Sequence, residues 1–362
     1  MGEQVRYGLV GAGMMGIEHI TNLAITPGAV VTALADPTRT SLDASLKALG
    51  EKAGSVQSFD SVEALATSGL CDAVIVASPN YTHRAVLEPV FDAGLHILCE
   101  KPVATTIADA KWIVERAEAS DKVFWTAMEY RYMPPAAEFI REIRDGRVGR
   151  LQMLSIREHR FPFLEKVGDW NRFNRNTGGT MVEKCCHFFD LMRLITQSEA
   201  VRVYCSGAMD VNHLDERYDG QMPDIIDNSY TTVDFANGVR AMLDLSMFAD
   251  GAENQEEIAA VGDKARLEVL IPEGAIVYSP RVGFRNAKQV ERRMVHTDET
   301  ALNAGSHHGS TFYEHQKFNA AVRGESKVEV TARDGLMAVA IGTAAEISAR
   351  EHRVVDMSEL GL

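Results

Sequence analysis

The chain has 362 residues, of which 46% are hydrophobic and 24% are charged, a composition typical of a globular protein with more than one domain. Its formal net charge of −14 argues against nucleic acid and anionic membranes as partners. No nonpolar run approaches the roughly 20 residues of a membrane-spanning helix. The first strand is predicted at 5–10, so we expect no signal peptide and a cytoplasmic location.

A glycine-rich turn follows this first strand and precedes a helix predicted at 16–25. The turn has the G-x-G-x-x-G spacing, which permits a tight turn, a close approach of the backbone to a pyrophosphate, and close packing of helix on strand. The helix N-terminus then offers free N–H groups to the phosphates. The turn therefore predicts a dinucleotide site along Gly11, Gly13, Met14, Met15 and Gly16.

Asp36 ends the second predicted strand, 30–35, and lies twenty residues after Gly16. A carboxylate at this position accepts hydrogen bonds from the ribose hydroxyls and repels a 2′-phosphate, which favours NAD over NADP. Arg39 follows three residues later and is able to pair with a 2′-phosphate, so NADP stays open as the less favoured cofactor. The alternative for Arg39 is an exposed arginine at the start of a helix.

The alternation of strands and helices continues to residue 127. Further strands are predicted at 73–77, 95–99 and 123–127, and further helices at 40–49, 61–67, 82–93 and 106–119. Such alternation is typical of a doubly wound parallel sheet. We therefore predict that residues 1–128 form a Rossmann dinucleotide-binding domain.

Lys101 follows the predicted strand 95–99 within the sequence Glu100-Lys101-Pro102. A lysine at the carboxyl end of such a strand points into the crevice where the nicotinamide is expected. Its ammonium group can hydrogen-bond a substrate hydroxyl and stabilise the alkoxide as a hydride leaves. Pro102 moves Lys101 out of the helical region, through a trans or a cis bond. The alternative is a surface lysine at a strand end.

The pattern changes in the second half of the chain, residues 129–362. Strands are predicted at 150–160, 201–208, 227–236, 239–247, 256–261 and 265–270, and helices at 135–145, 180–195, 310–323 and 333–349. Asn237-Gly238 is typical of a hairpin turn between two of these strands. We predict a second, α+β domain with a largely antiparallel sheet that helices cover on one face.

The predicted helix 180–195 follows Gly178-Gly179 and carries Glu183, Lys184 and His187. Residues four apart share a helix face, so Glu183 and His187 are expected side by side. A neutral imidazole there can take the proton of a hydroxyl group during hydride abstraction, while Glu183 holds a neighbouring hydroxyl or tunes the lysine. The alternative is a helix face with a satisfied histidine and an ion pair.

The five cysteines show no C-x-x-C spacing and are odd in number, which favours buried free thiols. Cys185, Cys186 and His187 are contiguous, but adjacent helical residues point about 100° apart and do not reach one metal ion easily. We therefore expect no metal site.

Together these residues resemble the Gfo/Idh/MocA family of glucose–fructose oxidoreductases, inositol dehydrogenases and rhizopine-catabolism proteins, over nearly the whole chain. The resemblance rests on GAGMMG at 11–16, Asp36, SPNYTH at 78–83, Glu100-Lys101-Pro102, Tyr130-Arg131-Tyr132-Met133-Pro134, Trp170 and the Gly178–His187 segment. It implies that Lys101 is catalytic and that His187 accepts the proton. It also implies an open, mostly antiparallel second sheet that binds substrate, homo-oligomers (dimers or tetramers), and cofactor contacts at Ser78, Pro79, Asn80, His83, Glu100 and Lys101.

The chain departs from the family at Glu183, where aspartate is usual, and at Lys184 and Cys185. The additional lysine raises the prospect of a cationic pocket for a carboxylated, phosphorylated or sulfonated sugar. The candidate substrate-binding residues are Tyr130, Arg157, His159, Trp170, Arg172, Glu183 and Lys184. The alternative is that the arginines pair with surface carboxylates such as Glu158, Glu165 and Asp169.

Three functions follow. The first is NAD-dependent oxidation of a secondary hydroxyl group on a sugar, glycoside or cyclitol. The second is an NAD-dependent glycosidase that oxidises, eliminates, hydrates and reduces an anionic glycoside such as a sulfoquinovoside. The third, an NAD-binding regulator without turnover, is disfavoured by the intact set of Lys101, Glu183 and His187.

Overall fold

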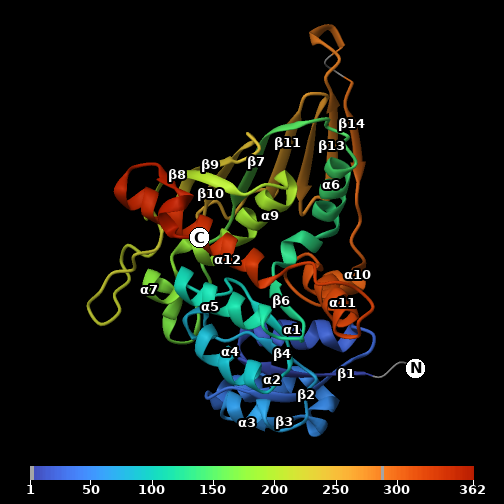
Figure 1. Cartoon of the computed structure of the whole chain (residues 1–362), viewed down its shortest axis with the longest axis vertical. Coiled ribbons are helices and arrows are strands. Elements are labelled where there is room, and N and C mark those ends of the chain that lie inside the picture. The colour runs from blue at the N-terminus through green and yellow to red at the C-terminus, as the bar shows by residue number, and fades with distance from the viewer. Residues whose placement is uncertain (1–3, 287–288) are drawn as a thin grey trace. The chain divides into compact units, whose positions relative to one another are not determined.

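The computed structural model describes residues 4–286 and 289–362, which form two compact units (Figure 1). The first unit contains the chain up to Tyr132 together with Asp298–Met337. The second contains Met133–Thr297 together with Ala338–Leu362. The segment 298–337 therefore packs with the N-terminal residues, although it follows the second sheet in sequence. The division of the chain at residue 128 remains a prediction.

The first unit is built on a six-stranded sheet in which every pair of neighbours is parallel. The strand order is β3-β2-β1-β4-β5-β6. The order reverses between β1 and β4, which is the point where doubly wound sheets bind their ligands. The strands are β1 (Val5–Val10), β2 (Ala29–Ala35), β3 (Gln57–Phe59), β4 (Ala73–Val76), β5 (His96–Glu100) and β6 (Phe124–Ala127).

Helices connect these strands and bury the nonpolar runs that predicted them. Thr106 caps α5 by accepting a hydrogen bond from the Asp109 N–H group, as the sequence Thr-x-x-Asp favours. From the C-terminal segment, α11 packs against α1, and Asn319 accepts a hydrogen bond of 2.9 Å from the buried Tyr7 hydroxyl. The helices are α1 (Met14–Ile25), α2 (Arg39–Leu49), α3 (Val62–Ala66), α4 (His83–Asp92), α5 (Ile107–Glu118), α10 (Glu299–Asn303) and α11 (Ser310–Val322).

The second unit is built on a nine-stranded sheet of order β14-β13-β12-β11-β7-β10-β9-β8-β15. Only β7 and β10 pair in parallel, so the sheet is open and mostly antiparallel, as predicted. The hairpin at Asn237-Gly238 joins β9 to β10, with Gly238 at φ +87°. The strands are β7 (Leu151–His159), β8 (Ala200–Ala208), β9 (Asn228–Phe235), β10 (Arg240–Ser246), β11 (Glu256–Gly262), β12 (Ala265–Ile271), β13 (Ala275–Pro280), β14 (Glu291–Met294) and β15 (Val355–Asp356).

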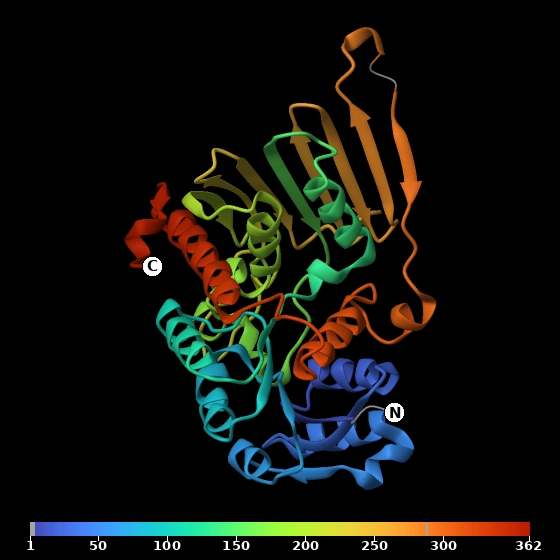
Figure 2. The same cartoon turned by 45° about the vertical axis from the view of Figure 1, so that its right-hand side comes forward.

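Helices cover one face of this sheet and leave the other open (Figure 2). Along β7 the side chains of Leu154, Ile156 and Glu158 are buried, whereas Ser155 and Arg157 between them are more exposed. This alternation follows from the two-residue period of a strand. The helices are α6 (Pro134–Arg144), α7 (Asn174–Thr177), α8 (Thr180–Glu183), α9 (Cys186–Thr196) and α12 (Ala332–Glu351), whose first residues belong to the first unit.

The segment 180–195, predicted as one helix, forms two helices, because the helical hydrogen-bonding pattern is interrupted at Lys184 and Cys185. The N–H groups of both residues donate to the same acceptor, the Thr180 carbonyl, at 3.0 and 3.2 Å. The regular spacing of helical hydrogen bonds is thereby lost for one turn. Glu183 ends α8 and His187 is the second residue of α9, so they do not share the face of one regular helix.

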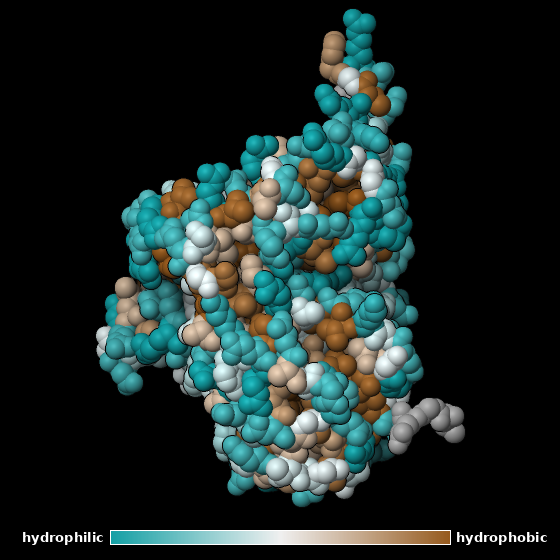
Figure 3. Space-filling view, viewed as in Figure 1, coloured by the Kyte–Doolittle hydropathy of each residue, from teal (hydrophilic) through white to brown (hydrophobic). Residues whose placement is uncertain are grey.

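In the described ranges, 4–286 and 289–362, no helix has both the length and the nonpolar character needed to cross a bilayer. Hydrophilic residues cover much of the visible surface of each unit in Figure 3, with nonpolar residues between them.

Candidate functional site

The glycine-rich turn joins β1 to α1 with the geometry that its spacing predicts. Gly11 has φ +95°, and a Cβ atom there would meet the backbone carbonyl of Ala77. A Cβ atom on Gly16 would meet the Gly11 carbonyl oxygen, so the helix packs closely on the turn. Gly13 has open space around its Cα atom. No side chain caps the N-terminus of α1, and no acidic residue lies in its first turn.

Asp36 lies at the carboxyl end of β2, beside this turn. Its Oδ2 accepts a hydrogen bond from the Ala12 N–H group and its Oδ1 accepts one from Thr38, both at 2.8 Å. A carboxylate has about four acceptor positions, so acceptor capacity for a diol remains. Arg39 is exposed and pairs with Asp43 at 3.0 Å, one helical turn along α2.

An NAD molecule fits these features. The open Cα of Gly13 and the uncapped α1 N-terminus provide space and N–H donors for a pyrophosphate. The fixed carboxylate of Asp36 provides the acceptor for a ribose. Met14 is exposed and Met15 partly buried at the first turn of α1.

The segment 78–83 joins β4 to α4. Asn80 is buried, and its side-chain N–H₂ group has no hydrogen-bond partner among the described residues. Ser78 Oγ and Thr82 Oγ1 share a hydrogen bond of 2.8 Å, and Pro79 precedes the turn. The unsatisfied amide of Asn80 supports its predicted place beside a ligand.

His83 is buried and links this segment to Lys101-Pro102-Val103. Nδ1 lies 3.0 Å from the Pro102 carbonyl oxygen, and Nε2 lies 3.1 Å from that of Ser78. Burial lowers the pKa of His83, so the ring is neutral and donates to one carbonyl at a time. These contacts show that His83 links the loop after β5 to the loop after β4.

Lys101 stands directly after β5 and its peptide bond to Pro102 is cis, which is one of the two forms considered from the sequence. The Lys101 N–H group donates to Glu100 Oε2 at 3.1 Å, and Glu100 Oε1 pairs with His19 Nε2 at 3.0 Å. His19 Nδ1 lies 3.0 Å from His315 Nε2. Burial raises the pKa of Glu100, but the hydrogen bond and charge of His19 outweigh it, so the pKa lies below its usual value.

Buried carboxylates lie near this loop in the first unit. Glu129 and Tyr130 are both buried in the short 3-10 helix Glu129–Tyr132. Burial raises the pKa of Glu129 to about 7. The Trp125 indole N–H group donates to Glu314 at 3.2 Å, and burial raises the pKa of Glu314 well above its usual value. Lys101, which is partly exposed, therefore stands beside a group of buried acids whose charges interact with its own.

In the second unit, Gly178 and Gly179 adopt φ +79° and +93° and turn the chain into α8. A Cβ atom on Gly179 would meet the Glu346 side chain of α12. Glu346 accepts a hydrogen bond of 2.9 Å from the Met181 N–H group, and burial raises its pKa to about 7. Glu183, Lys184 and His187 follow, and all three are buried.

The cationic side chains predicted to bind substrate all have protein carboxylates beside them. Lys184 pairs with the buried Glu158, Arg157 with Glu257, His159 with Asp244, and Arg172 with Glu216. Arg157 and His159 alternate with Glu158 along β7 and therefore lie on the opposite face of the sheet from Lys184. Trp170 lies in the irregular segment Val167–Arg172, partly buried.

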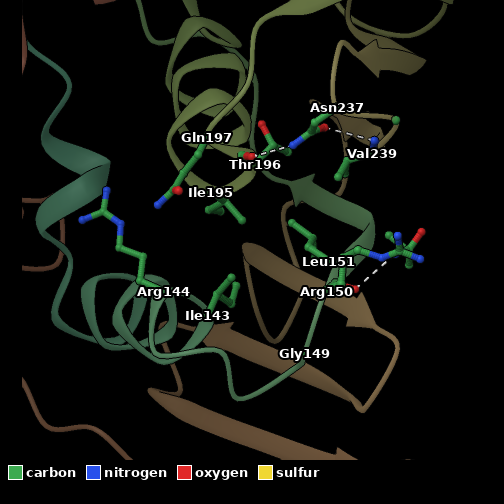
Figure 4. A pocket seen from close by; sticks show the side chains of 12 residues that line it. Ile143, Arg144, Gly149, Arg150, Leu151, Ile195, Thr196, Gln197, Asn237 and Val239 are labelled. Carbon is green, nitrogen blue, oxygen red and sulfur yellow. Dashed lines mark hydrogen bonds between the residues drawn. The ribbon is translucent and has the colours of Figure 1, made fainter.

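A pocket of about 410 Å³ lies at the other end of α9, beside the β9–β10 hairpin (Figure 4). Ile143, Ile195 and Leu151 point into it, and none of the predicted site residues lines it. The five cysteines are buried free thiols. Across the residues that the structure describes, no three His, Cys, Asp or Glu side chains are arranged to hold a metal ion.

Several residues with a structural part in this site were not predicted. His19 lies one helical turn after Gly16, and a histidine on a nonpolar helix face was the available signal. Nothing in the sequence around Glu129, Glu314 and Glu346 distinguishes them from exposed acids. Tertiary packing buries Glu129 and Glu314 and partly buries Glu346.

Comparisons with known proteins agree with both halves of the chain. A family model described as an oxidoreductase family, NAD-binding Rossmann fold, matches residues 5–128. The C-terminal alpha/beta domain of the same oxidoreductase family matches residues 140–357.

Individual relatives span the full length. The chain is 25% identical to a myo-inositol 2-dehydrogenase of Thermotoga maritima, over 98% of this chain and 99% of that protein. It is 32% identical to an inositol 2-dehydrogenase of Corynebacterium glutamicum, over 56% of this chain and 57% of that protein. A levoglucosan dehydrogenase crystallised with NADH has a similar fold, with a TM-score of 0.84 at 21% identity over 98% of this chain and 99% of that one.

Proposed function

The chain belongs to the Gfo/Idh/MocA oxidoreductase family, and we propose that it oxidises a secondary hydroxyl group of a sugar, glycoside or cyclitol, with NAD as hydride acceptor. The observation that carries the proposal is the place of Lys101. It follows β5 directly, in the same sheet whose β1–α1 turn is built for a dinucleotide. Its main-chain N–H group donates to Glu100, and His83 contacts the carbonyl of the next residue, Pro102. The names of the relatives, inositol 2-dehydrogenases and a levoglucosan dehydrogenase, support a cyclic polyol as substrate.

Each residue has a separate part in this proposal. Lys101 donates a hydrogen bond to the reacting oxygen and stabilises negative charge as it develops. His187 takes the hydroxyl proton, and Glu183 accepts a hydrogen bond from a neighbouring hydroxyl group. The bound cofactor, held at the β1–α1 turn and Asp36, would supply the acceptor for the hydride of the substrate carbon. The pairing of Lys101 with His187 rests on the family resemblance of the two motifs.

We favour a neutral polyol over an anionic sugar. An anionic substrate requires cationic groups whose charge is available. Arg157 pairs with Glu257 and Arg172 with Glu216, while Lys184 shares the buried Glu158 with Arg160. Each of these cations is therefore already engaged by a carboxylate of the protein. This removes the main reason for a sulfoquinovoside, and none of the relatives described above supports the glycosidase.

The experiment incubates the protein with NAD and a panel of cyclitols, pyranoses and 1,6-anhydrosugars, together with neutral and anionic nitrophenyl glycosides. The proposal predicts NADH that accumulates with a polyol in proportion to product. Nitrophenolate released at substoichiometric NAD, without lasting NADH, would establish the glycosidase. Binding of NADH without turnover of any substrate would favour the regulator.

We also propose a homo-oligomer that forms through the open face of the second sheet, in a cytoplasmic location. The open face exposes large nonpolar side chains at Met153, Tyr204 and Tyr230, the last of them 63% exposed. Such a face supports contact with a second copy of the chain. Light scattering of the protein and of Tyr230→Lys tests this, because a monomer in both cases contradicts it.

A further inference from the structure

Four charged side chains meet in the second unit at the break between α8 and α9, and we call them the acid-pair cluster: Glu158, Arg160, Lys184 and Glu256. Glu158 of β7 and Glu256 of β11 lie directly opposite each other on neighbouring strands, and 0% and 1% of their surface is exposed. Lys184 Nζ lies 2.9 Å from Glu158 Oε1, and the Arg160 guanidinium lies 3.4 Å from the same oxygen. Both cations therefore contact the same carboxylate oxygen, Glu158 Oε1.

The other carboxylate oxygens of the pair are not satisfied. Glu158 Oε2 and Glu256 Oε2 are buried and have no hydrogen-bond partner among the described residues, whereas Glu256 Oε1 accepts from Gln255 at 2.6 Å. Opposed side chains on neighbouring antiparallel strands have Cβ atoms about 4.5–5.5 Å apart. Two enclosed carboxyl groups at such a separation do not both ionise readily. A single proton held between them satisfies both orphan oxygens.

The cluster is attached to the segment that carries the proposed proton acceptor. Lys184 follows Glu183 directly and precedes His187 by three residues. The backbone at Lys184 and Cys185 is the irregular turn between the helices, and its N–H groups share one acceptor. The ion pair of Lys184 with Glu158 therefore anchors this irregular turn to β7.

We propose that Glu158 and Glu256 are positioning residues for the oxidation: they share a proton, clamp Lys184 and so fix the helix break that presents Glu183 and His187. This inference rests on the proposed function and deepens it. It gives Lys184 a part in holding the helix break instead of a part in recognising the substrate.

The charge of the cluster changes with the protonation of Glu256. The groups that face it are Glu158 and Arg160 from β7 and the residue after it, Lys184 from the helix break and Ile271 from β12. Burial, and then the charge of Glu158, raise the pKa of Glu256 to about 7. Loss of its proton neutralises the cluster's excess positive charge, and we expect the protonation of His187, three residues after Lys184, to respond to this change.

The test compares Glu256→Gln, Lys184→Met and the double variant Lys184→Met/Glu158→Gln with the parent protein. Glu257→Gln is the matched control, because Glu257 is the next residue of β11 and pairs with Arg157 on the opposite face. The readouts are kcat and KM from pH 5.5 to 9, the KM for NAD, and the NMR titration of His187, assigned by its absence in His187→Asn.

Glu256→Gln is expected to remove one inflection near neutral pH from the pH profile of kcat and from the NMR titration curve of His187. The KM for NAD is expected to stay within twofold of the parent value. Lys184→Met is expected to lower kcat at least tenfold, and the double variant to recover at least threefold of that loss. The proposal is overturned if the Glu256→Gln profiles superimpose on those of the parent and of Glu257→Gln. It is also overturned if Lys184→Met raises only the substrate KM. If the parent oxidises no polyol, the His187 titration still decides the cluster, while the proposed function fails.

Discussion

Glu346 offers a direct test of how tertiary packing sets the stability of the second unit. Its side chain, on α12, accepts a hydrogen bond of 2.9 Å from the Met181 N–H group and packs against Gly179, at the start of α8. Burial raises its pKa to about 7 from a usual value of 4.5. The folded protein therefore holds a proton between these two pH values that the unfolded chain releases.

The sign follows from linkage. Where the folded state binds more protons than the unfolded state, the free energy of unfolding falls as the pH rises. One pKa unit corresponds to about 1.36 kcal/mol, so Glu346 costs at most about 3 kcal/mol above pH 7. Because part of the Glu346 side chain is exposed to solvent, screening reduces this cost to about 2 kcal/mol.

The perturbation is Glu346→Gln, which keeps a carbonyl acceptor for the Met181 N–H group and removes the titration. As the pH rises from 5 to 8, the free energy of unfolding of the variant is expected to increase by about 2 kcal/mol relative to that of the parent. Urea unfolding followed by circular dichroism at several pH values measures this difference. The other buried acids contribute equally to the parent and the variant, so their contributions cancel in the difference. Glu351→Gln, at the exposed end of the same helix, is the control. Parallel curves for the parent and Glu346→Gln would refute the reasoning.

Three further predictions concern the first unit. Asp36→Ser is expected to raise the KM for NAD at least tenfold and to reduce the preference for NAD over NADP, measured by steady-state kinetics with both cofactors. An unchanged KM for NAD would exclude Asp36 from the ribose site. Lys101→Met is expected to lower kcat by roughly 10²–10⁴ while NADH binding, followed by fluorescence, stays within twofold; full activity would exclude Lys101 from the reaction. Gly11→Ala is expected to cost about 1–3 kcal/mol, because alanine disfavours a φ of +95° and its Cβ meets the Ala77 carbonyl; an unchanged melting temperature would contradict this.

The parallel sheet could be predicted from the sequence because its central strands are buried on both faces. The run Val5–Val10 and the run Ala73–Val76 are almost wholly nonpolar, and each ends at a glycine or polar turn. The glycine spacing carried as much information, since Gly11 needs a positive φ and Gly16 a close contact. Local chemistry thus determined both the fold and the predicted cofactor.

The second unit could be predicted less fully, because its details depend on contacts between distant residues. Periodicity indicates one helix over 180–195, but the pairing of Lys184 with Glu158 and the shared acceptor at Thr180 accompany a break that no local pattern indicates. The short strand Glu291–Met294 is polar and largely exposed, so it gave no alternating signal. The sequence offered pairing of the arginines with nearby carboxylates as an alternative, but the actual partners of Arg157 and Arg172, Glu257 and Glu216, come from distant parts of the chain and could not be identified from it.

In the proposed reaction a hydride leaves a substrate carbon and stays on the cofactor. The most direct measurement uses the preferred polyol with deuterium on the carbon that bears the reacting hydroxyl group, followed by mass spectrometry of cofactor and product. The account predicts deuterated NADH in equal amount to ketone, and loss of both in Lys101→Met. Deuterium that returns to the product, or NADH without the label, would contradict it.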